Sequence, residues 1–198
     1  MKVLIDNGHG LDTAGKCSPD GTYREWAWSR EIAQMIVEEL TRRGYDARRI
    51  VTEQTDVSLP ERARRVNEIC ARYDSDKVLL VSIHSNAAGN GDWMSAHGWC
   101  AYTSKGKTNA DVLATYIYNE AEKNFKGKRI RTDYSDGDPD WEEGFYILRK
   151  TKCPAVLTEN FFHDNHEDLA YITSDEGKRA IVKTHVDGII NYINSHRS

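Results

Sequence analysis

The apolar run at residues 78–83 is the feature that most constrains how this chain can fold. Five of its six residues are Val, Leu or Ile. Such a run predicts a strand that is buried on both faces, as in the middle of a parallel sheet. The run stops at His84, which is followed by Ser85, Asn86 and a Gly-rich turn. We therefore expect a central strand that ends in a side chain able to bind a metal or move a proton.

Two other apolar runs end in the same way. Residues 2–6 lead into His9 within a Gly-rich turn, and residues 155–158 end in Glu159. In open α/β sheets, ligands bind at the edge formed by the carboxyl ends of the parallel strands. We therefore expect His9, His84 and Glu159 to meet at one edge of the sheet, and the protein to be an enzyme with its site there.

Helical spacing and capping signals alternate with these strands. Helices are predicted at about residues 23–43, 58–73 and 108–124, and from residue 173 onward. Strands are predicted at residues 2–6, 45–53, 78–84, 98–103, 145–148 and 154–159, and residues 126–144 form an acidic loop. This order predicts an α/β fold of three layers, with a twisted, mostly parallel sheet flanked by helices. The length suits one domain and no linker is evident, so residues 1–198 are expected to form a single catalytic domain.

Charge and hydropathy exclude several classes of protein. A net charge of -4 provides no basic field for nucleic acid, so that partner is not expected. No apolar run approaches the ~20 residues of a membrane span. The chain enters its first predicted strand at Lys2, which leaves no room for a signal peptide. We expect the protein to be made in the cytoplasm and to be monomeric.

The four cysteines lie far apart and form no CxxC pair. This spacing argues against a zinc–cysteine site and against a redox dithiol. Free, partly buried thiols are the expectation, although the sequence leaves isolated disulfides open. The residues concerned are Cys17, Cys70, Cys100 and Cys153.

His9 and His84 are candidate zinc ligands, because each imidazole follows a buried strand and has small neighbours that give access. A third protein ligand is needed if one position stays open for water. Glu25 is our candidate, since it lies in the first turn of the helix after the first strand, where the helix dipole favours a carboxylate. The structural alternatives are hydrogen-bonded histidines and a glutamate that only caps its helix.

Glu159 is the candidate base. It ends a run of Ala, Val, Leu and Thr, and Glu is almost never fully buried unless it is paired. Burial would raise the pKa of Glu159 and a nearby cation would lower it, so the carboxylate can be tuned to accept a proton from water. The structural alternative is a salt bridge to a surface arginine such as Arg149. His163 and His166 lie in polar surroundings, and we expect both to be surface or substrate-rim residues.

Several motifs occur in one order along nearly the whole chain: residues 5–10, Glu25, residues 56–62 with Asn67, and residues 81–87, 145–149 and 154–159. Together they resemble the zinc-dependent N-acetylmuramoyl-L-alanine amidases that hydrolyse peptidoglycan. The resemblance implies His9, Glu25 and His84 as zinc ligands and Glu159 as the catalytic glutamate. There are two departures. The family usually has Pro where Asn7 stands, and a Gly soon after the catalytic Glu where this chain has Asn160-Phe161-Phe162.

The resemblance also implies the reaction, which is hydrolysis of the amide between N-acetylmuramic acid and L-alanine. Zinc would lower the pKa of its water to roughly 7 and polarise the carbonyl, while Glu159 takes the water proton and later gives it to the leaving amine. Asn86 and Trp93 of one loop, and Trp141 of the acidic loop, are expected to contact substrate. An acidic loop that is simply solvated is the alternative for Trp141.

Two other functions remain open at the level of the sequence. A zinc peptidase or deacetylase would use the same ligands and base on another amide. A non-catalytic peptidoglycan-binding module is the third possibility, and absence of zinc would favour it. A lone catalytic domain without a signal suits an endolysin of a phage or mobile element that acts on the cell wall after release, and it also suits a cytoplasmic recycling enzyme.

Overall fold

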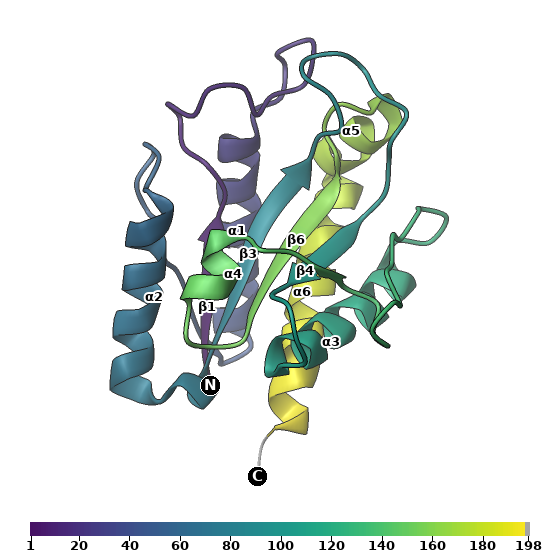
Figure 1. Cartoon of the computed structure of the whole chain (residues 1–198). Helices are drawn as coiled ribbons and strands as arrows, with labels where there is room; N and C mark the ends of the chain where they lie inside the picture. The colour runs from purple at the N-terminus through teal and green to yellow at the C-terminus, as the bar shows by residue number, and fades with distance from the viewer. Residues whose placement is uncertain (197–198) are drawn as a thin grey trace.

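A computed structural model describes residues 1–196 and shows one α/β domain built on a six-stranded sheet. The strand order is β2-β1-β3-β6-β4-β5 (Figure 1). The strands are β1 (Lys2–Asn7), β2 (Asp46–Arg49), β3 (Val78–Asn86), β4 (Cys100–Thr103), β5 (Trp141–Glu142) and β6 (Ala155–Phe162). Strands β2, β1, β3 and β6 are parallel, whereas β4 runs antiparallel to β6. The mostly parallel sheet expected from the sequence is confirmed.

The apolar runs form the centre of this sheet. Strand β1 pairs with β3, and β3 pairs with β6, so the three strands lie side by side. Their register places Asn7 opposite Ile83 and His84 opposite Glu159. The carboxyl ends of the three strands therefore meet at one edge, and the residues that follow them are brought together.

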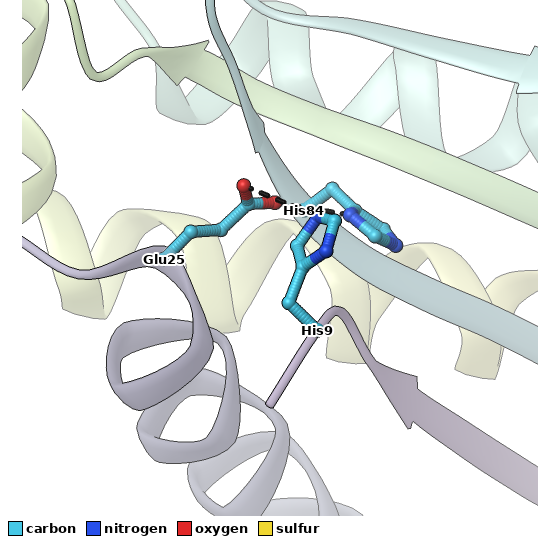
Figure 2. Close-up of side chains that lie close together, drawn as sticks. All are labelled: His9, Glu25 and His84. Carbon is cyan, nitrogen blue, oxygen red and sulfur yellow. Dashed lines mark hydrogen bonds and ion pairs between the residues drawn. The ribbon is translucent and has the colours of Figure 1, made fainter. Parts of the chain in front are cut away.

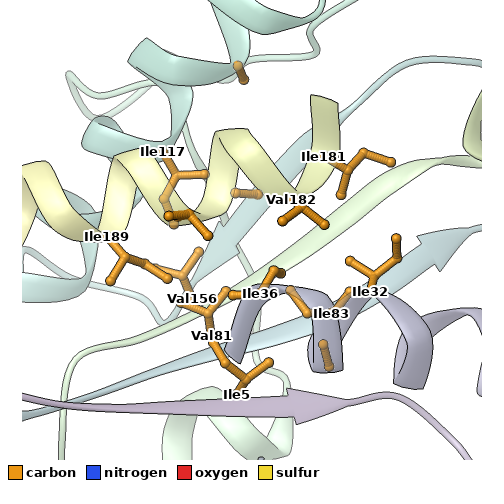
Figure 3. Close-up of a cluster of buried hydrophobic side chains, with 14 of the residues drawn as sticks. Ile5, Ile32, Ile36, Val81, Ile83, Ile117, Val156, Ile181, Val182 and Ile189 are labelled. Atoms are coloured by element: carbon orange, nitrogen blue, oxygen red, sulfur yellow. The ribbon is translucent and has the colours of Figure 1, made fainter. Parts of the chain in front are cut away.

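Helices cover both faces of the sheet and complete the three layers (Figure 1). They are α1 (Glu25–Arg42), α2 (Leu59–Tyr73), α3 (Asn109–Asn124), α4 (Tyr146–Lys150), α5 (His166–Thr173) and α6 (Asp175–Ser195), with a short 3-10 turn at Ser75–Lys77. The larger core lies between the sheet and helices α1, α3, α5 and α6. Figure 3 shows part of it, where Ile36 of α1 lies near Val81 and Val156 of the central strands and Ile32 lies near Ile83. The smaller core packs α2 and α4 on the other face.

Local signals explain where several helices begin. The Ser58 side chain accepts a hydrogen bond from the Glu61 backbone N–H, and Pro60 occupies the first turn of α2. Ser174 caps α6 in the same way through the N–H of Gly177. Each cap satisfies a backbone donor that the helix itself leaves unpaired. The positions of α1, α2, α3 and α6 agree with the sequence prediction to within two residues at their starts.

The expected strand at residues 145–148 is wrong, because this segment forms the short helix α4. Ile147 and Leu148 are buried together and pack with α2 in the smaller core. A short apolar run fits a buried strand or a buried helix equally well by periodicity. Packing against α2 selects the helix here. Helix α5 was also not predicted, since its polar first turn is typical of a loop.

Both departures from the family pattern have structural consequences. Phe161 lies in the segment Asn160-Phe161-Phe162, where the family usually has a Gly, and adopts a φ of 67°, a left-handed conformation that is costly for a residue with a Cβ. Its fully buried ring packs against Phe125 and Tyr171 and offsets that strain. Asn7 is also fully buried, and neither polar atom of its side chain has a hydrogen-bond partner within residues 1–196.

All four cysteines are free, as expected, with Cys70, Cys100 and Cys153 buried and Cys17 partly buried. Among the described helices, none combines the length and the apolar character that crossing a bilayer requires.

Candidate active site

Three elements bring His9, Glu25 and His84 together at the carboxyl edge of the sheet (Figure 2). His9 follows β1, Glu25 opens α1, and His84 lies near the end of β3. Nδ1 of His84 lies 3.0 Å from Oε1 of Glu25, and Nε2 of His9 lies 3.3 Å from Oε2. One carboxylate thus spans two imidazoles, whose rings are perpendicular with centroids 5.1 Å apart. The three predicted ligands form one cluster.

The electrostatics of this cluster keep Glu25 ionised. Its carboxylate is 1 % exposed, and burial alone would raise its pKa. The hydrogen bonds to His84 and His9 outweigh burial and hold that pKa well below its usual range. Burial alone would lower the pKa of His84, but its contact with Glu25 raises it instead. The backbone N–H of Ser85 donates a further hydrogen bond to Oε1 of Glu25 at 3.1 Å.

The turn that carries His9 is tightly constrained. His9 has a φ of 60°, which is uncommon for a residue with a side chain. The preceding residue, Gly8, lies against the His84 ring, where a Cβ atom would come within 2.3 Å of Cε1. Only glycine fits there without displacing a candidate ligand. The Gly8-His9 sequence therefore reflects the close approach of the turn to β3.

Arg62 of α2 holds the turn that carries His9 through several hydrogen bonds. Its Nη1 donates to the carbonyl of Asn7 at 2.6 Å and to Oδ1 of Asp6 at 2.7 Å. Its Nη2 donates to the carbonyl of His9 at 3.2 Å and to Oδ1 of Asp56 at 3.0 Å. Arg62 is 2 % exposed, so this network replaces water around a buried charge. It ties α2 to the segment that presents His9.

Glu159 faces the same cluster from β6. It is the register partner of His84, and its Oε2 is buried without a hydrogen-bond partner in the described part of the chain. Burial raises the pKa of Glu159 to about 7, against the opposing charge of His84. The alternative of a salt bridge to Arg149 finds no support, because Nε of that arginine donates to the Gly144 carbonyl. A buried carboxylate oxygen without a partner, beside an open cavity, is suited to proton transfer.

These residues line a cavity of about 370 Å³. The polar part of its lining includes His9, Glu25, His84 and Glu159. The apolar part is formed by Val57, Leu59, Phe145, Tyr146, Ile147 and Leu157. Such a mixed cleft suits a substrate that joins apolar or sugar surface to a polar, reacting amide.

The three predicted substrate-contact residues are placed differently. Asn86 lines the cavity. Trp93 does not, and its ring stacks on His166 with centroids 3.6 Å apart. Trp141 does not line the cavity either, and lies with its ring 5.3 Å from the guanidinium of Arg131. Because neither tryptophan lines this cavity, their contact with substrate stays a prediction.

The expectation that His163 is a surface residue is wrong. It is 2 % exposed, and its ring stacks on Tyr23 with centroids 5.5 Å apart. Its Nδ1 lies 3.0 Å from Oγ of Ser85, which in turn lies 2.7 Å from the Tyr23 hydroxyl. Burial lowers the pKa of His163, so the ring is neutral near pH 7. No local sequence pattern indicates this contact, which depends on the turn after β6. His166, by contrast, is exposed as expected.

The donor set fits zinc. Two imidazole nitrogens and one carboxylate oxygen lie within 4.8 Å of one another, and they are the only such group of three His, Cys, Asp or Glu donors among residues 1–196. Zinc binds these ligand types, and catalytic zinc sites use three protein ligands with one position open. The unpartnered Oε2 of Glu159 lies in the same cavity wall, where a water held by the metal would find an acceptor.

Comparisons with known proteins point to one family. The N-acetylmuramoyl-L-alanine amidase family model matches residues 3–191. The endolysin of Bacillus phage SPP1 is 29% identical over 196 residues, which cover 97% of this chain and 66% of the endolysin. The amidase CwlM of Bacillus licheniformis is 26% identical, covering 98% of this chain and 69% of CwlM. The chain thus spans about two thirds of these curated relatives.

A solved structure extends the match to three dimensions. The N-acetylmuramoyl-L-alanine amidase of Clostridium difficile 630 superposes with a TM-score of 0.82 at 27% identity, covering 98% of this chain and 97% of that one. The matched fold, the ordered motifs and the family model lead to one conclusion. This chain belongs to the N-acetylmuramoyl-L-alanine amidase family.

Proposed function

We propose that the protein is a zinc-dependent hydrolase of peptidoglycan that cleaves the amide between N-acetylmuramic acid and L-alanine. The single observation that carries this proposal is the convergence of His9, Glu25 and His84 beside Glu159 at one edge of the sheet. Membership of the amidase family supports the choice of bond. The names of the relatives, a phage endolysin and an amidase, support a role in breaking down the cell wall.

His9, Glu25 and His84 would hold the zinc ion. When bound, zinc would activate a water molecule and polarise the scissile carbonyl. Glu25 brings one negative charge to the site, and the two imidazoles would ligate as neutral rings. The hydrogen bond from the Ser85 N–H helps to fix the orientation of the Glu25 carboxylate before any ligand arrives.

Glu159 supplies the proton transfers. Its carboxylate accepts a proton from the water whose oxygen forms a bond to the carbonyl carbon. It then donates that proton to the L-alanine nitrogen as the carbon–nitrogen bond breaks, and a carboxylic acid and a free amine result. A pKa near 7 suits both roles, because general acid–base catalysis works best when the pKa lies near the working pH.

Digestion of purified peptidoglycan tests the reaction. The amidase is expected to release the amino group of L-alanine without creating new reducing sugar ends. A peptidase would free a different amino group, and a deacetylase would release acetate. Binding to the wall without any product would indicate a non-catalytic module.

Metal analysis of the same preparation tests the cofactor. We expect one zinc per chain, loss of activity with a chelator, and recovery when zinc is restored. Full activity in a metal-free sample would remove zinc from the proposal while leaving the amidase reaction intact.

We also propose a monomer that is made in the cytoplasm and reaches the wall after release. Sedimentation of the purified protein and wall digestion by lysates test these two points.

A further inference from the structure

We propose that Lys16 recognises a carboxylate on the stem peptide, the anionic group carried by the residue after the L-alanine that is released. This inference rests on the proposed amidase function and deepens it by naming a preference within the substrate. It assigns a binding role to a loop residue that none of the sequence motifs contains.

The position of Lys16 is fixed relative to the candidate ligands. It lines the same cavity as His9, Glu25 and Glu159. Its carbonyl accepts a hydrogen bond of 2.9 Å from the backbone N–H of Glu25, the first residue of α1. Lys16 has a φ of 53°, and the next residue, Cys17, forms an antiparallel bridge with Arg24. The loop is therefore anchored to the helix start that carries a candidate ligand.

The side chain of Lys16 has no hydrogen bond and no ion pair with any of residues 1–196. The acidic residues of its own loop are engaged elsewhere. Oδ1 of Asp12 accepts from the backbone N–H of Asp56 at 2.6 Å. Oδ1 of Asp20 accepts from the hydroxyls of Ser18 and Thr22. The ammonium group is thus free to meet a ligand.

Among the other charged residues of the lining, Arg62 and Glu25 have charged partners, whereas Oε2 of Glu159 has no hydrogen-bond partner in the described residues. Arg62, the other cation in the lining, is held by Asp6 and Asp56. Glu25 lies between its two histidines. Within the described residues, Lys16 is therefore the lining cation without an ion-pair partner.

The chemistry of the substrate supplies a matching group. A stem peptide whose residue after L-alanine bears a carboxylate would present an anion here, and the carboxamide form of the same peptide would present a neutral group. Two extended residues span about 7 Å, which leaves this group close to the scissile amide. The apolar lining residues Leu59, Phe145 and Tyr146 offer no charge to bind it. The ammonium group of Lys16 does.

Two soluble muramyl peptides that differ only in this group, carboxylate or carboxamide, test the inference. We expect the wild type to prefer the carboxylate by about tenfold in kcat/KM, the size of one charge-assisted hydrogen bond. In Lys16→Met, kcat/KM should fall on the carboxylate peptide alone, so the preference is lost. Lys16→Arg should keep most of the preference, because its side chain keeps the positive charge. Lys105→Met is the matched control. Lys105 is exposed in the loop after β4, whose antiparallel direction places that loop at the opposite edge of the sheet.

The outcomes separate the two proposals. If the wild type hydrolyses both peptides without a preference, or if Lys16→Met loses activity equally on both, the inference is overturned, since Lys16 then does not discriminate the carboxylate of the substrate. Calorimetric binding of both peptides to zinc-loaded Glu159→Gln gives a readout without turnover. Tighter binding of the carboxylate peptide that Lys16→Met abolishes would support the inference even if the wild type hydrolysed neither peptide. That last result would contradict the proposed function alone.

Discussion

His84 and Glu159 are register partners on the neighbouring parallel strands β3 and β6. Because in-register residues of paired strands point to the same face of a sheet, the two side chains enter one cavity from adjacent positions. One is a candidate metal ligand and the other has a buried oxygen without a partner in the described structure. Metal binding and proton transfer are thus assigned to different side chains, so a mutation can remove one function and leave the other.

Glu159→Gln is expected to abolish most activity and to leave zinc in place. The variant keeps the volume of the side chain and does not alter His9, Glu25 or His84. Loss of a general base typically costs ~10²–10⁴-fold, so kcat should fall by at least that much with little change in KM. Stability should hold or rise slightly, because a buried group is no longer able to ionise. Steady-state kinetics and metal analysis check this; loss of zinc would make Glu159 a ligand.

His84→Ala is expected to lose zinc and activity together while the domain stays folded. The ring lies at the end of β3 in the cavity wall and outside both apolar cores, so its removal leaves those two cores intact. Metal content, activity and far-UV circular dichroism measured on one sample check the result. Stoichiometric zinc in this variant would remove His84 from the ligand set.

The sequence alone predicts the strands and site residues that local residue patterns determine. Continuous apolar runs locate β1, β3 and β6, and the polar residues that end them identify His9, His84 and Glu159. The same reasoning fails where tertiary packing determines the secondary structure or the burial of a residue. Residues 145–148 are apolar enough for a strand but form α4 against α2, and so supply Phe145 and Tyr146 to the cavity wall. Local polarity around His163 suggests solvent, yet the turn after β6 buries it.

Lys16 illustrates a second limit of sequence patterns. A lysine in a Gly- and Ser-rich loop is expected to be solvated, and Lys16 is indeed exposed. Only the backbone contact between Lys16 and Glu25 reveals that the loop folds back over the helix start and lines the cavity. Trp93 and Trp141 show the converse. Aromatic side chains in loops suggest substrate contact, whereas these two rings are engaged with His166 and Arg131.

His163→Leu is expected to weaken zinc binding by about 10–100-fold, as loss of an outer-shell hydrogen bond does at other metal sites. The leucine still fills buried space but no longer holds Oγ of Ser85. The backbone N–H of Ser85, which orients Glu25, is then less well fixed. Competition with a chromophoric chelator measures the affinity. His97→Leu, at an exposed position, is the control, and equal affinities in the two variants would limit His163 to a packing role.

His185 is expected to make folding stability depend on pH below neutrality. The ring is fully buried in α6, with Nδ1 2.7 Å from the Ile181 carbonyl and Nε2 2.9 Å from Oγ1 of Thr158. Nδ1–H therefore donates to the carbonyl, and Nε2 accepts from the threonine hydroxyl, as only a neutral ring can do. Burial lowers the pKa of His185 to about 4.

The sign of the effect follows from proton binding. Between about pH 6.5 and pH 4 the unfolded chain binds a proton at His185 that the folded chain does not, so the free energy of unfolding falls as the pH falls. The stabilisation is complete above pH 6.5, and the loss by pH 4 amounts to about 3 kcal/mol from this residue. Denaturant unfolding across this range, with a chelator present so that zinc release does not contribute, measures it. His185→Leu should remove this part of the slope, because leucine does not titrate. Parallel pH profiles for the wild type and His185→Leu would show that His185 is not the titrating group.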